Sequence, residues 1–358
     1  MADSGKISTT ETTINPEIDT RAVPSRSFLL RWMSTRAAFI LIVDLVLIVF
    51  FTLLSKNHVF FSVANFKSML LNGTEIMLLA LGLSMLLGAG EFDLSLGSNL
   101  VLSSVIGANL MVAVGGGQTV GNQLPHVILT IFLGLLICLL AGMLFGLVNG
   151  LLIAYGRINS LITTLGTMGI GLGLALLFSK NGQDITGFPI QLQSEFGLKT
   201  IGSFPVPALL ALVIAVVLWA IVAHTKFGRH TLAIGSSRVA AERAGLRIKP
   251  HLLKLTIIAG GLAGLAAFVD LAHFQTTVIS GHPNDALIAV TAVVLGGTLL
   301  EGGRISIFGT IFGVALTMIL RNGLVIAGIY SSYQLVVVGV VLIIAVGLDR
   351  ISVYRRSV

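Results

Sequence analysis

The chain has 358 residues, of which 55% are hydrophobic and 10% are charged, and its mean hydropathy is +0.99. Soluble domains carry about 25% charged residues, so this composition excludes an ordinary soluble protein and predicts a lipid bilayer as the main solvent. The formal net charge of +7 does not indicate a nucleic-acid partner, because the positive residues are sorted between loops as in membrane proteins.

Residues 1–36 are polar and contain Pro16 and Pro24, which indicates a cytoplasmic tail and an uncleaved first span rather than a cleavable secretory signal. From residue 37 onward, apolar runs recur with short polar breaks. We therefore predict an all-α, polytopic helical bundle of about ten transmembrane helices at 37–350, followed by a cytoplasmic tail at 351–358. The predicted spans are 37–54, 74–88, 96–114, 127–153, 160–178, 206–223, 253–273, 286–300, 305–324 and 332–348.

Two of these spans, 74–88 and 286–300, are short. Transporters place broken helices of this kind near the middle of the bilayer. A tilted neighbouring helix or a misplaced boundary would explain the lengths equally well.

The positive residues predict the orientation. With the N-terminus inside, the inner segments carry 17 Lys and Arg residues and the outer segments carry 5. Because cytoplasmic loops are enriched in Lys and Arg, this distribution predicts that both termini and a long loop at 225–252 are cytoplasmic, and that the number of spans is even.

Small residues predict close helix packing. Gly142, Gly146 and Gly150 form two overlapping GxxxG steps, and Gly169 and Gly173 form another. Glycine lets helix backbones approach each other, so we interpret these motifs as packing contacts rather than chemistry. The only cysteine, Cys138, excludes a disulfide within the chain and a cysteine metal cluster.

The clearest polar cluster lies between the second and third spans, at 90–98. The glycines allow an interrupted helix, and Asp93 can cap the helix that follows. The remaining polar atoms are then candidates for lining a hydrophilic solute pathway; an ordinary cytoplasmic turn with a capping aspartate fits the sequence equally well. The candidate pathway residues here are Glu91, Phe92, Asp93, Ser95 and Ser98.

A second polar group begins at the end of the seventh span and continues to residue 285. Its candidate pathway residues are Asp270, His273 and Gln275, which would line an outer vestibule. A solvated outer loop is the alternative. His273 and His282 are nine residues apart with no third ligand nearby in the sequence, so no metal site is expected.

Asp44 is a single acidic residue in the middle of the first span. We expect it to face a polar neighbour or to be protonated. Proton coupling is the alternative, although no histidine or lysine relay accompanies it.

The cytoplasmic loop contains a predicted amphipathic helix at 235–246, which Gly245 ends. Val239, Ala240 and Leu246 are expected near one side, with the charged residues at 238, 242 and 243 on the surface. Such a helix is suited to docking against another protein, and binding to anionic lipid headgroups is the alternative.

The sequence contains no G-x-x-x-x-G-K-[ST] loop, no HExxH motif and no nucleophile elbow. We therefore expect a chain that is not an enzyme and has no ATPase site or bound cofactor of its own. If ATP drives it, a partner must bind the ATP and Mg²⁺.

Three stretches resemble the permeases of bacterial ABC importers of the ribose, xylose and arabinose type. The family motif G-x-I/F-D-L-S-V-G-S is similar to residues 90–98 and matches at Asp93, Leu94, Ser95, Gly97 and Ser98. The C-terminal signature is similar to 293–298, Gly302-Gly303, Gly309-Thr310, Gly313 and 322–324. The stretch from 227 to 246 resembles the family's coupling helix, and the likeness as a whole runs from about 37 to 350.

This resemblance implies a permease subunit in the bacterial inner membrane that pairs with a second permease subunit as a homodimer or heterodimer. It also implies a cytoplasmic ABC ATPase and a periplasmic binding protein that delivers a sugar or sugar-like solute. The residues that would contact the ATPase are Arg238, Ala240, Ala241, Glu242, Arg243 and Gly245.

Two departures from the family affect these assignments. Relatives often have Glu-Leu-Asp before the V-L-G-G block, whereas here Asp285 is displaced by one residue, and Arg238-Val239 stands where relatives often have an acidic residue.

The alternatives to an ABC importer permease are an ion- or proton-coupled secondary transporter and a membrane scaffold without transport activity.

Overall fold

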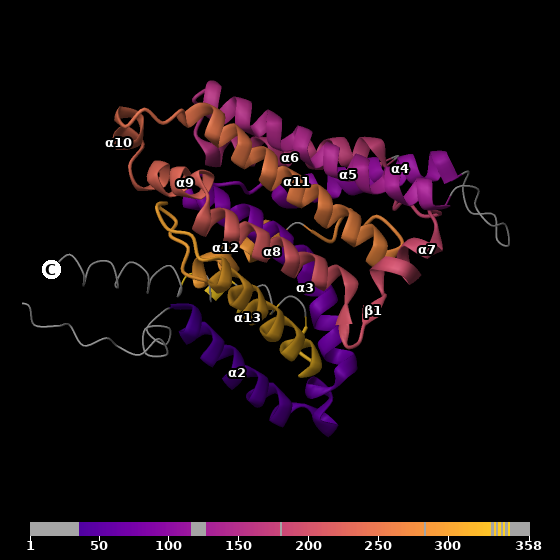
Figure 1. The fold of residues 1–358 in the computed structure, drawn as a ribbon. Coiled ribbons are helices and arrows are strands. Elements are labelled where there is room, and N and C mark those ends of the chain that lie inside the picture. Colours follow the sequence, from indigo (N-terminus) through magenta and orange to yellow (C-terminus); the bar gives the residue numbers. More distant parts are fainter. Residues whose placement is uncertain are drawn as a thin grey trace, which may run out of the picture.

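The computed structural model describes residues 36–115, 127–179, 181–282, 284–330, 333, 336, 337, 339, 340 and 343. These residues form a bundle of helices, with one two-stranded antiparallel sheet of β1 (Thr200–Ile201) and β2 (Phe204–Pro205) (Figure 1). The α-helices are α2 (Arg36–Leu54), α3 (Val63–Gly88), α4 (Leu96–Gly115), α5 (Val127–Gly150), α6 (Ser160–Phe178), α7 (Ile190–Leu192), α8 (Val206–His224), α9 (Lys226–Ser236), α10 (Arg238–Arg243), α11 (Ile248–Phe274), α12 (Asp285–Leu295) and α13 (Ile307–Ile326). A 3₁₀-helix lies at Lys56–Phe61, and π-helices lie at Leu151–Tyr155 and Gln193–Gly197.

The prediction of a polytopic, all-helical membrane bundle is confirmed. In the described part of the chain, eight helices are long and apolar enough to cross a membrane, and α12 is a shorter apolar helix. The tenth predicted span, 332–348, the C-terminal tail and nearly all of the N-terminal tail lie outside the described residues. The orientation of the bundle and the cytoplasmic location of the termini stay predictions.

Three predicted boundaries are wrong, and one of them is the end of α12, which lies at Leu295 instead of residue 300. Helix α3 begins at Val63 instead of residue 74 and has 26 residues, so the second span is not short. Ser62 accepts a hydrogen bond from the backbone N–H of Asn65, and this N-cap starts the helix ahead of its apolar stretch. Helix α11 begins at Ile248 instead of 253, so the predicted loop at 225–252 is largely helical.

Helix α12 confirms the other short span. It has 11 residues, which at 1.5 Å per residue gives a length of about 16 Å, roughly half of an apolar bilayer core. Before it, the chain turns at Gln275, whose φ is 58°, and folds back through 276–282. The first turn of α12 meets the first turn of α4, because a Cβ on Gly97 would lie 2.9 Å from the backbone oxygen of His282 and 3.7 Å from the nitrogen of Ala286. Two helix N-termini thus meet inside the bundle.

The GxxxG prediction is confirmed for α5, which packs along α11. A Cβ on Gly142 would lie 2.3 Å from the backbone oxygen of Gly260, and a Cβ on Gly146 would lie 2.2 Å from that of Thr256. By contrast, a Cβ on Gly169 or Gly173 in α6 would meet no atom within 4 Å. The same motif therefore marks a close contact on one helix and open space within this chain on another.

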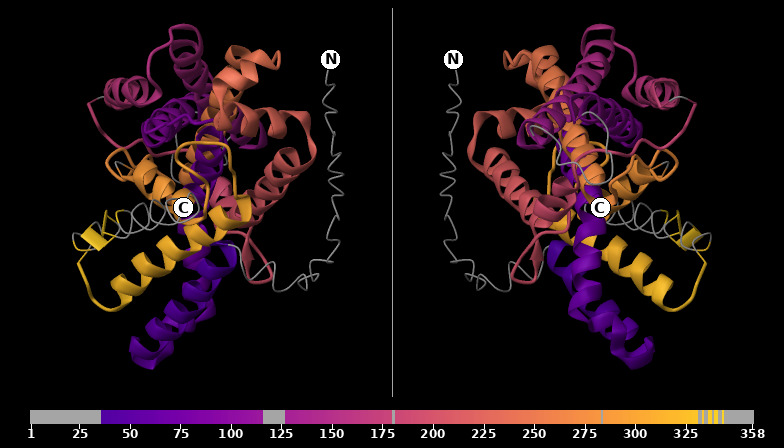
Figure 2. Two further views of the ribbon diagram at one scale, coloured as in Figure 1. Left: turned by 90° about the vertical axis from the view of Figure 1, so that its left-hand side faces the viewer. Right: turned by 90° about the vertical axis from the view of Figure 1, so that its right-hand side faces the viewer.

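Helices α9 and α10 lie at one end of the bundle, and α7 and β1 lie at the opposite end (Figure 1). Figure 2 shows α2 at the periphery, where it packs mainly against α13. The loop after α12 reaches the α9 end, since the backbone N–H of Gly303 donates to the oxygen of Gly88 at 3.0 Å. Gly302 and Gly303 have φ values of 93° and 79°, and a Cβ on Gly302 would lie 2.8 Å from Gly235, so this loop requires glycine at both positions.

Candidate functional site

Asp93 lies in the linker between α3 and α4 and is buried at 2% exposure. Its Oδ1 accepts hydrogen bonds from the backbone N–H of Ser95 at 2.8 Å and from the Ser95 hydroxyl at 2.5 Å. The amide of Asn149 on α5 donates to the Ser95 hydroxyl at 2.8 Å and lies 3.4 Å from Asp93 Oδ2. Burial raises the pKa of Asp93, and the hydrogen bonds from Ser95 and Asn149 lower it. Asp93 thus forms a turn in front of α4 instead of capping its first turn, and a neutral amide holds it to α5.

The other candidates in this stretch fix the linker to neighbouring helices. The Ser98 hydroxyl donates to the Ser95 backbone oxygen at 2.8 Å, and the Phe92 backbone N–H donates to the Ser160 hydroxyl at the start of α6 at 3.2 Å. Asn149 was not among the candidate pathway residues; as a single amide within an apolar run it is expected to bridge helices, and it does so here.

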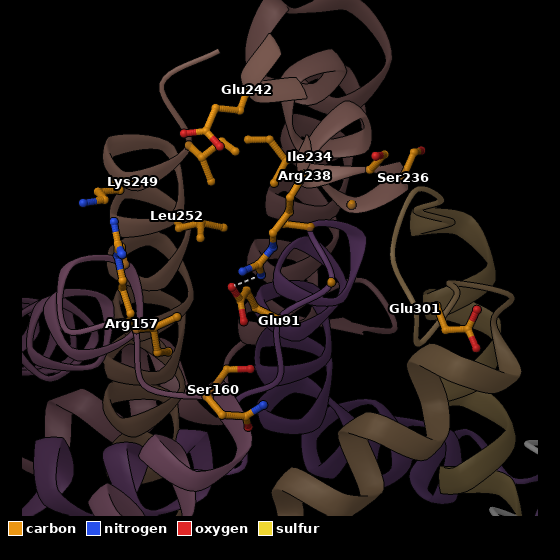
Figure 3. A pocket seen from close by; sticks show the side chains of 18 of the residues that line it. Glu91, Arg157, Ser160, Ile234, Ser236, Arg238, Glu242, Lys249, Leu252 and Glu301 are labelled. Atoms are coloured by element: carbon orange, nitrogen blue, oxygen red, sulfur yellow. Dashed lines mark hydrogen bonds and ion pairs between the residues drawn. The ribbon is translucent and has the colours of Figure 1, made fainter. Parts of the chain in front are cut away.

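Glu91, at the beginning of the same linker, forms an ion pair with the guanidinium of Arg238 at the start of α10 (Figure 3). The Glu91 side chain is 4% exposed and that of Arg238 is 49% exposed. The sequence predicts that Glu91 lines the solute pathway and that Arg238 contacts a partner. The fold joins the two, so part of the Arg238 side chain is directed into the bundle instead of lying free on the surface.

A cavity of about 960 Å³ lies around this ion pair at the α9–α10 end. Figure 3 shows Arg157 and Lys249 on one wall and Glu301 on the other. Ser160 and Leu252 also line it. Asp93, Ser95 and Ser98 are not among its lining residues, so the buried linker cluster and the cavity are separate in the described structure.

Helix α10 differs from its predicted form. The predicted helix at 235–246 is divided at Ser237, whose side chain caps α10 by accepting from the Ala240 backbone N–H. The buried residue is Ala241, whereas Val239 is 61% exposed and Ala240 is also exposed, so the predicted apolar side is wrong. Glu242 and Arg243 are exposed as predicted, and Gly245 follows the helix with a φ of 81°. The helix therefore presents an apolar side chain between charged ones.

The second predicted group is largely buried, so a solvated outer loop is wrong for its central members. Asp270 on α11 is fully buried, and the His273 side chain is 15% exposed. Gln193 donates to the backbone oxygen of His273 at 2.8 Å, and Gln275 donates to that of Pro189 at 3.5 Å. These residues attach the end of α11 to the 185–197 region.

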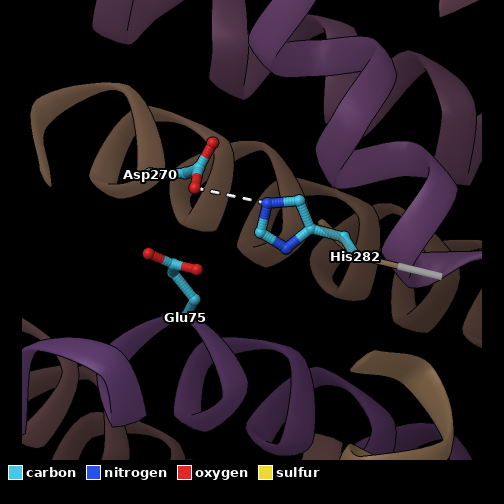
Figure 4. A group of neighbouring side chains, drawn as sticks. All are labelled: Glu75, Asp270 and His282. Carbon is cyan, nitrogen blue, oxygen red and sulfur yellow. Dashed lines mark ion pairs between the residues drawn. The ribbon is translucent and has the colours of Figure 1, made fainter. Parts of the chain in front are cut away.

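Asp270 belongs to a cluster that the sequence did not bring together. It lies beside Glu75 on α3 and His282 in the segment between α11 and α12 (Figure 4). His282 Nε2 is 3.3 Å from Asp270 Oδ1, and its Nδ1 is 2.6 Å from Asp285 Oδ2. Burial lowers the pKa of His282, but the two aspartates raise it more, to about 11. Glu75 was missed because no local pattern distinguishes one acid in an apolar run; its only signal was the cost of placing it there.

Asp44 on α2 is 3% exposed, and neither of its carboxylate oxygens has a hydrogen-bond partner among the described residues. It lines an apolar cavity of about 660 Å³ between α2, α3, α8 and α13. Asp44 thus has no hydrogen-bonding neighbour in the described part of the chain, and its protonation stays a prediction.

Comparison with known proteins shows which family the chain belongs to. Residues 65–346 match the family described as branched-chain amino acid transport system permease component. The chain belongs to this family. The permease is 36% identical to the ribose import permease protein of Bacillus subtilis (strain 168) over 278 residues, which cover 76% of this chain and 80% of that protein. It is 30% identical to the ribose import permease protein of Escherichia coli (strain K12) over 327 residues, which cover 91% and 96%.

A third relative of the permease is the D-allose transport system permease protein of Escherichia coli (strain K12), at 32% identity over 276 residues, which cover 75% of this chain and 80% of that protein. No solved structure matches the permease. The family and the helices together identify a multi-pass membrane protein that is a component of a transport system.

Proposed function

We propose that the permease is the membrane-spanning subunit of an ATP-binding-cassette importer, which carries a sugar or sugar-like solute across the bacterial inner membrane. The observation that carries this proposal is the similarity to the Escherichia coli ribose import permease over 91% of this chain and 96% of that protein. The family match makes a secondary transporter the weaker alternative.

The proposed importer has three further components besides this chain. A cytoplasmic ATPase binds ATP and Mg²⁺ and docks at the α9–α10 end. A periplasmic binding protein delivers the solute at the α7–β1 end. A second permease subunit, identical or related, completes the membrane part.

The ion pair between Glu91 and Arg238 supports a specific route of coupling. Arg238 begins α10, the exposed helix that would seat in the ATPase, and Glu91 lies two residues before Asp93. A movement of α10 would therefore pull on the linker that precedes α4. Because this linker is fixed to α5 through Asn149 and to α6 through Ser160, its displacement would alter the packing around the first turn of α4. In this proposal the ion pair transmits the movement, and the solute pathway adjoins the meeting point of α4 and α12.

The test is reconstitution. The full-length permease is expressed with its ATPase, purified by a tag on the permease, and incorporated into liposomes with the binding protein and labelled ribose or allose. The expected result is co-purification of the ATPase and uptake that requires ATP, is stopped by vanadate and survives an uncoupler. Uptake by the permease alone, or uptake that an uncoupler abolishes, would reject the proposal in favour of a secondary transporter.

A further inference from the structure

The cluster of Glu75, Asp270 and His282 has the donor set of a metal site. One carboxylate oxygen from each acid and a ring nitrogen of His282 all lie within 4.8 Å of one another. The distance between His282 Nε2 and Asp270 Oδ1 is 3.3 Å. In a tetrahedral zinc site with bonds of about 2.0 Å, neighbouring donors are about 3.3 Å apart. One edge of the cluster thus already has the separation that a shared cation requires.

The donor atoms are buried and unsatisfied. Glu75 Oε1, both oxygens of Asp270 and His282 Nε2 make no hydrogen bond of good geometry to any described residue. Asp270 is fully buried, and Glu75 and His282 are each 6% exposed. Figure 4 shows the three side chains directed toward one another. The contacts that these atoms do make are ion pairs: His282 Nε2 lies 3.3 Å from Asp270 Oδ1, and Glu75 Oε1 lies 3.9 Å from His273 Nδ1. Buried polar atoms nearly always have a hydrogen-bond partner, so donors that converge without one indicate a ligand between them.

His282 is also oriented as a metal ligand. Its Nδ1 lies 2.6 Å from Asp285 Oδ2, so an N–H at Nδ1 donates to that carboxylate. Without metal, the other nitrogen, Nε2, carries a proton and pairs with Asp270. A bound ion would displace this proton, and Nε2 is then the nitrogen that ligates it. A carboxylate that holds the outer ring nitrogen of a ligating histidine is the usual arrangement around protein metal ions. Three segments thus supply the site: α3, α11 and the connection that leads into α12.

We propose that Glu75, Asp270 and His282 bind a divalent transition-metal ion of the Zn²⁺ type, which holds α3, α11 and the connection at 275–282 together. The two carboxylates neutralise the ion, and the imidazole favours a transition metal over Mg²⁺ or Ca²⁺, which prefer oxygen donors. The site is structural and does not depend on which solute the permease carries. This proposed site contradicts the expectation that the chain has no metal site. That expectation took account of His273 and His282 only, and not of the acidic residues that the fold places beside His282.

The experiment measures metal content directly. The full-length permease in lipid nanodiscs is stripped with a chelator, loaded with Zn²⁺ alone, desalted and analysed by plasma mass spectrometry. The wild type is expected to retain about one zinc per chain. Glu75→Gln and His282→Gln should lose it, and Asp285→Asn should bind with an affinity about 10 to 100 times weaker. Asp44→Asn, which removes another buried acid outside the cluster, is the matched control and should retain the zinc.

The inference is overturned if the loaded wild type holds no zinc, or if His282→Gln holds as much as the wild type. A second readout covers the case in which the variants do not insert. Wild-type permease loaded with Co²⁺ should show the visible absorption bands of nitrogen and oxygen ligands in a low-symmetry site, and a spectrum like that of the aqueous ion would equally exclude the site.

Discussion

Replacing Arg238 with glutamine should uncouple the permease from its ATPase while the two remain associated. The substitution leaves the Glu91 carboxylate, which is 4% exposed, without its counter-charge. Breaking a fully buried pair costs about 3–5 kcal/mol, and exposed pairs are worth about 0.2–1 kcal/mol. Because the Arg238 side chain is 49% exposed, solvent screens the interaction, and we expect an intermediate cost of about 1–2 kcal/mol. This cost corresponds to a factor of about 5 to 30 in an equilibrium constant, and we expect ATP-dependent uptake to fall by a similar factor.

The assay compares ATP-dependent solute uptake in proteoliposomes with co-purification of the ATPase. Arg238→Gln should lower uptake and leave the amount of bound ATPase unchanged. The matched control is Arg243→Gln on the same helix, where the side chain is exposed and no ion pair is found among the described residues. Because Arg243 is a predicted ATPase contact, uptake is compared per bound ATPase, and by this measure Arg243→Gln should match the wild type.

A double-mutant cycle isolates the pair. Glu91→Gln removes the unpaired charge, so Glu91→Gln/Arg238→Gln should lose less uptake than the two single losses together. Additive losses, or equal losses in Arg238→Gln and Arg243→Gln, would refute the coupling route through this ion pair.

Three further predictions follow from the same structure. Asp93→Ala should lose uptake while membrane insertion and ATPase binding persist, as measured by transport and pull-down; normal transport would leave Asp93 with only a role in the turn. Arg243→Glu should weaken ATPase association, because its charge faces outward on α10, and unchanged co-purification would remove it from the docking surface. Gly142→Ala should destabilise the permease by about 1–3 kcal/mol through overpacking against Gly260, seen as a lower melting temperature in detergent. Gly169→Ala, whose Cβ would meet no atom of this chain, should melt like the wild type, and equal melting of both variants would contradict the packing account.

The candidate site was predicted in part. The sequence singled out Glu91, Asp93 and Arg238, since charged residues next to apolar spans are costly and therefore informative. It did not predict that Glu91 and Arg238 form a pair, because 147 residues separate them and no local pattern encodes that contact. It likewise missed Glu75, which has no acidic or histidine neighbour in the chain and acquires Asp270 and His282 as neighbours only when α3 packs beside α11.

Local composition was enough to predict the membrane class, the helical bundle and most of the span boundaries. Each segment must separately avoid exposing polar groups to lipid, so the information is present in short stretches of sequence. The folded chain was needed to show which GxxxG motif forms a close contact, where Arg238 is directed, and which buried acids share one site. These outcomes depend on the relative placement of distant helices, and in lipid that placement follows from packing and paired polar groups, which hydropathy along the chain does not record.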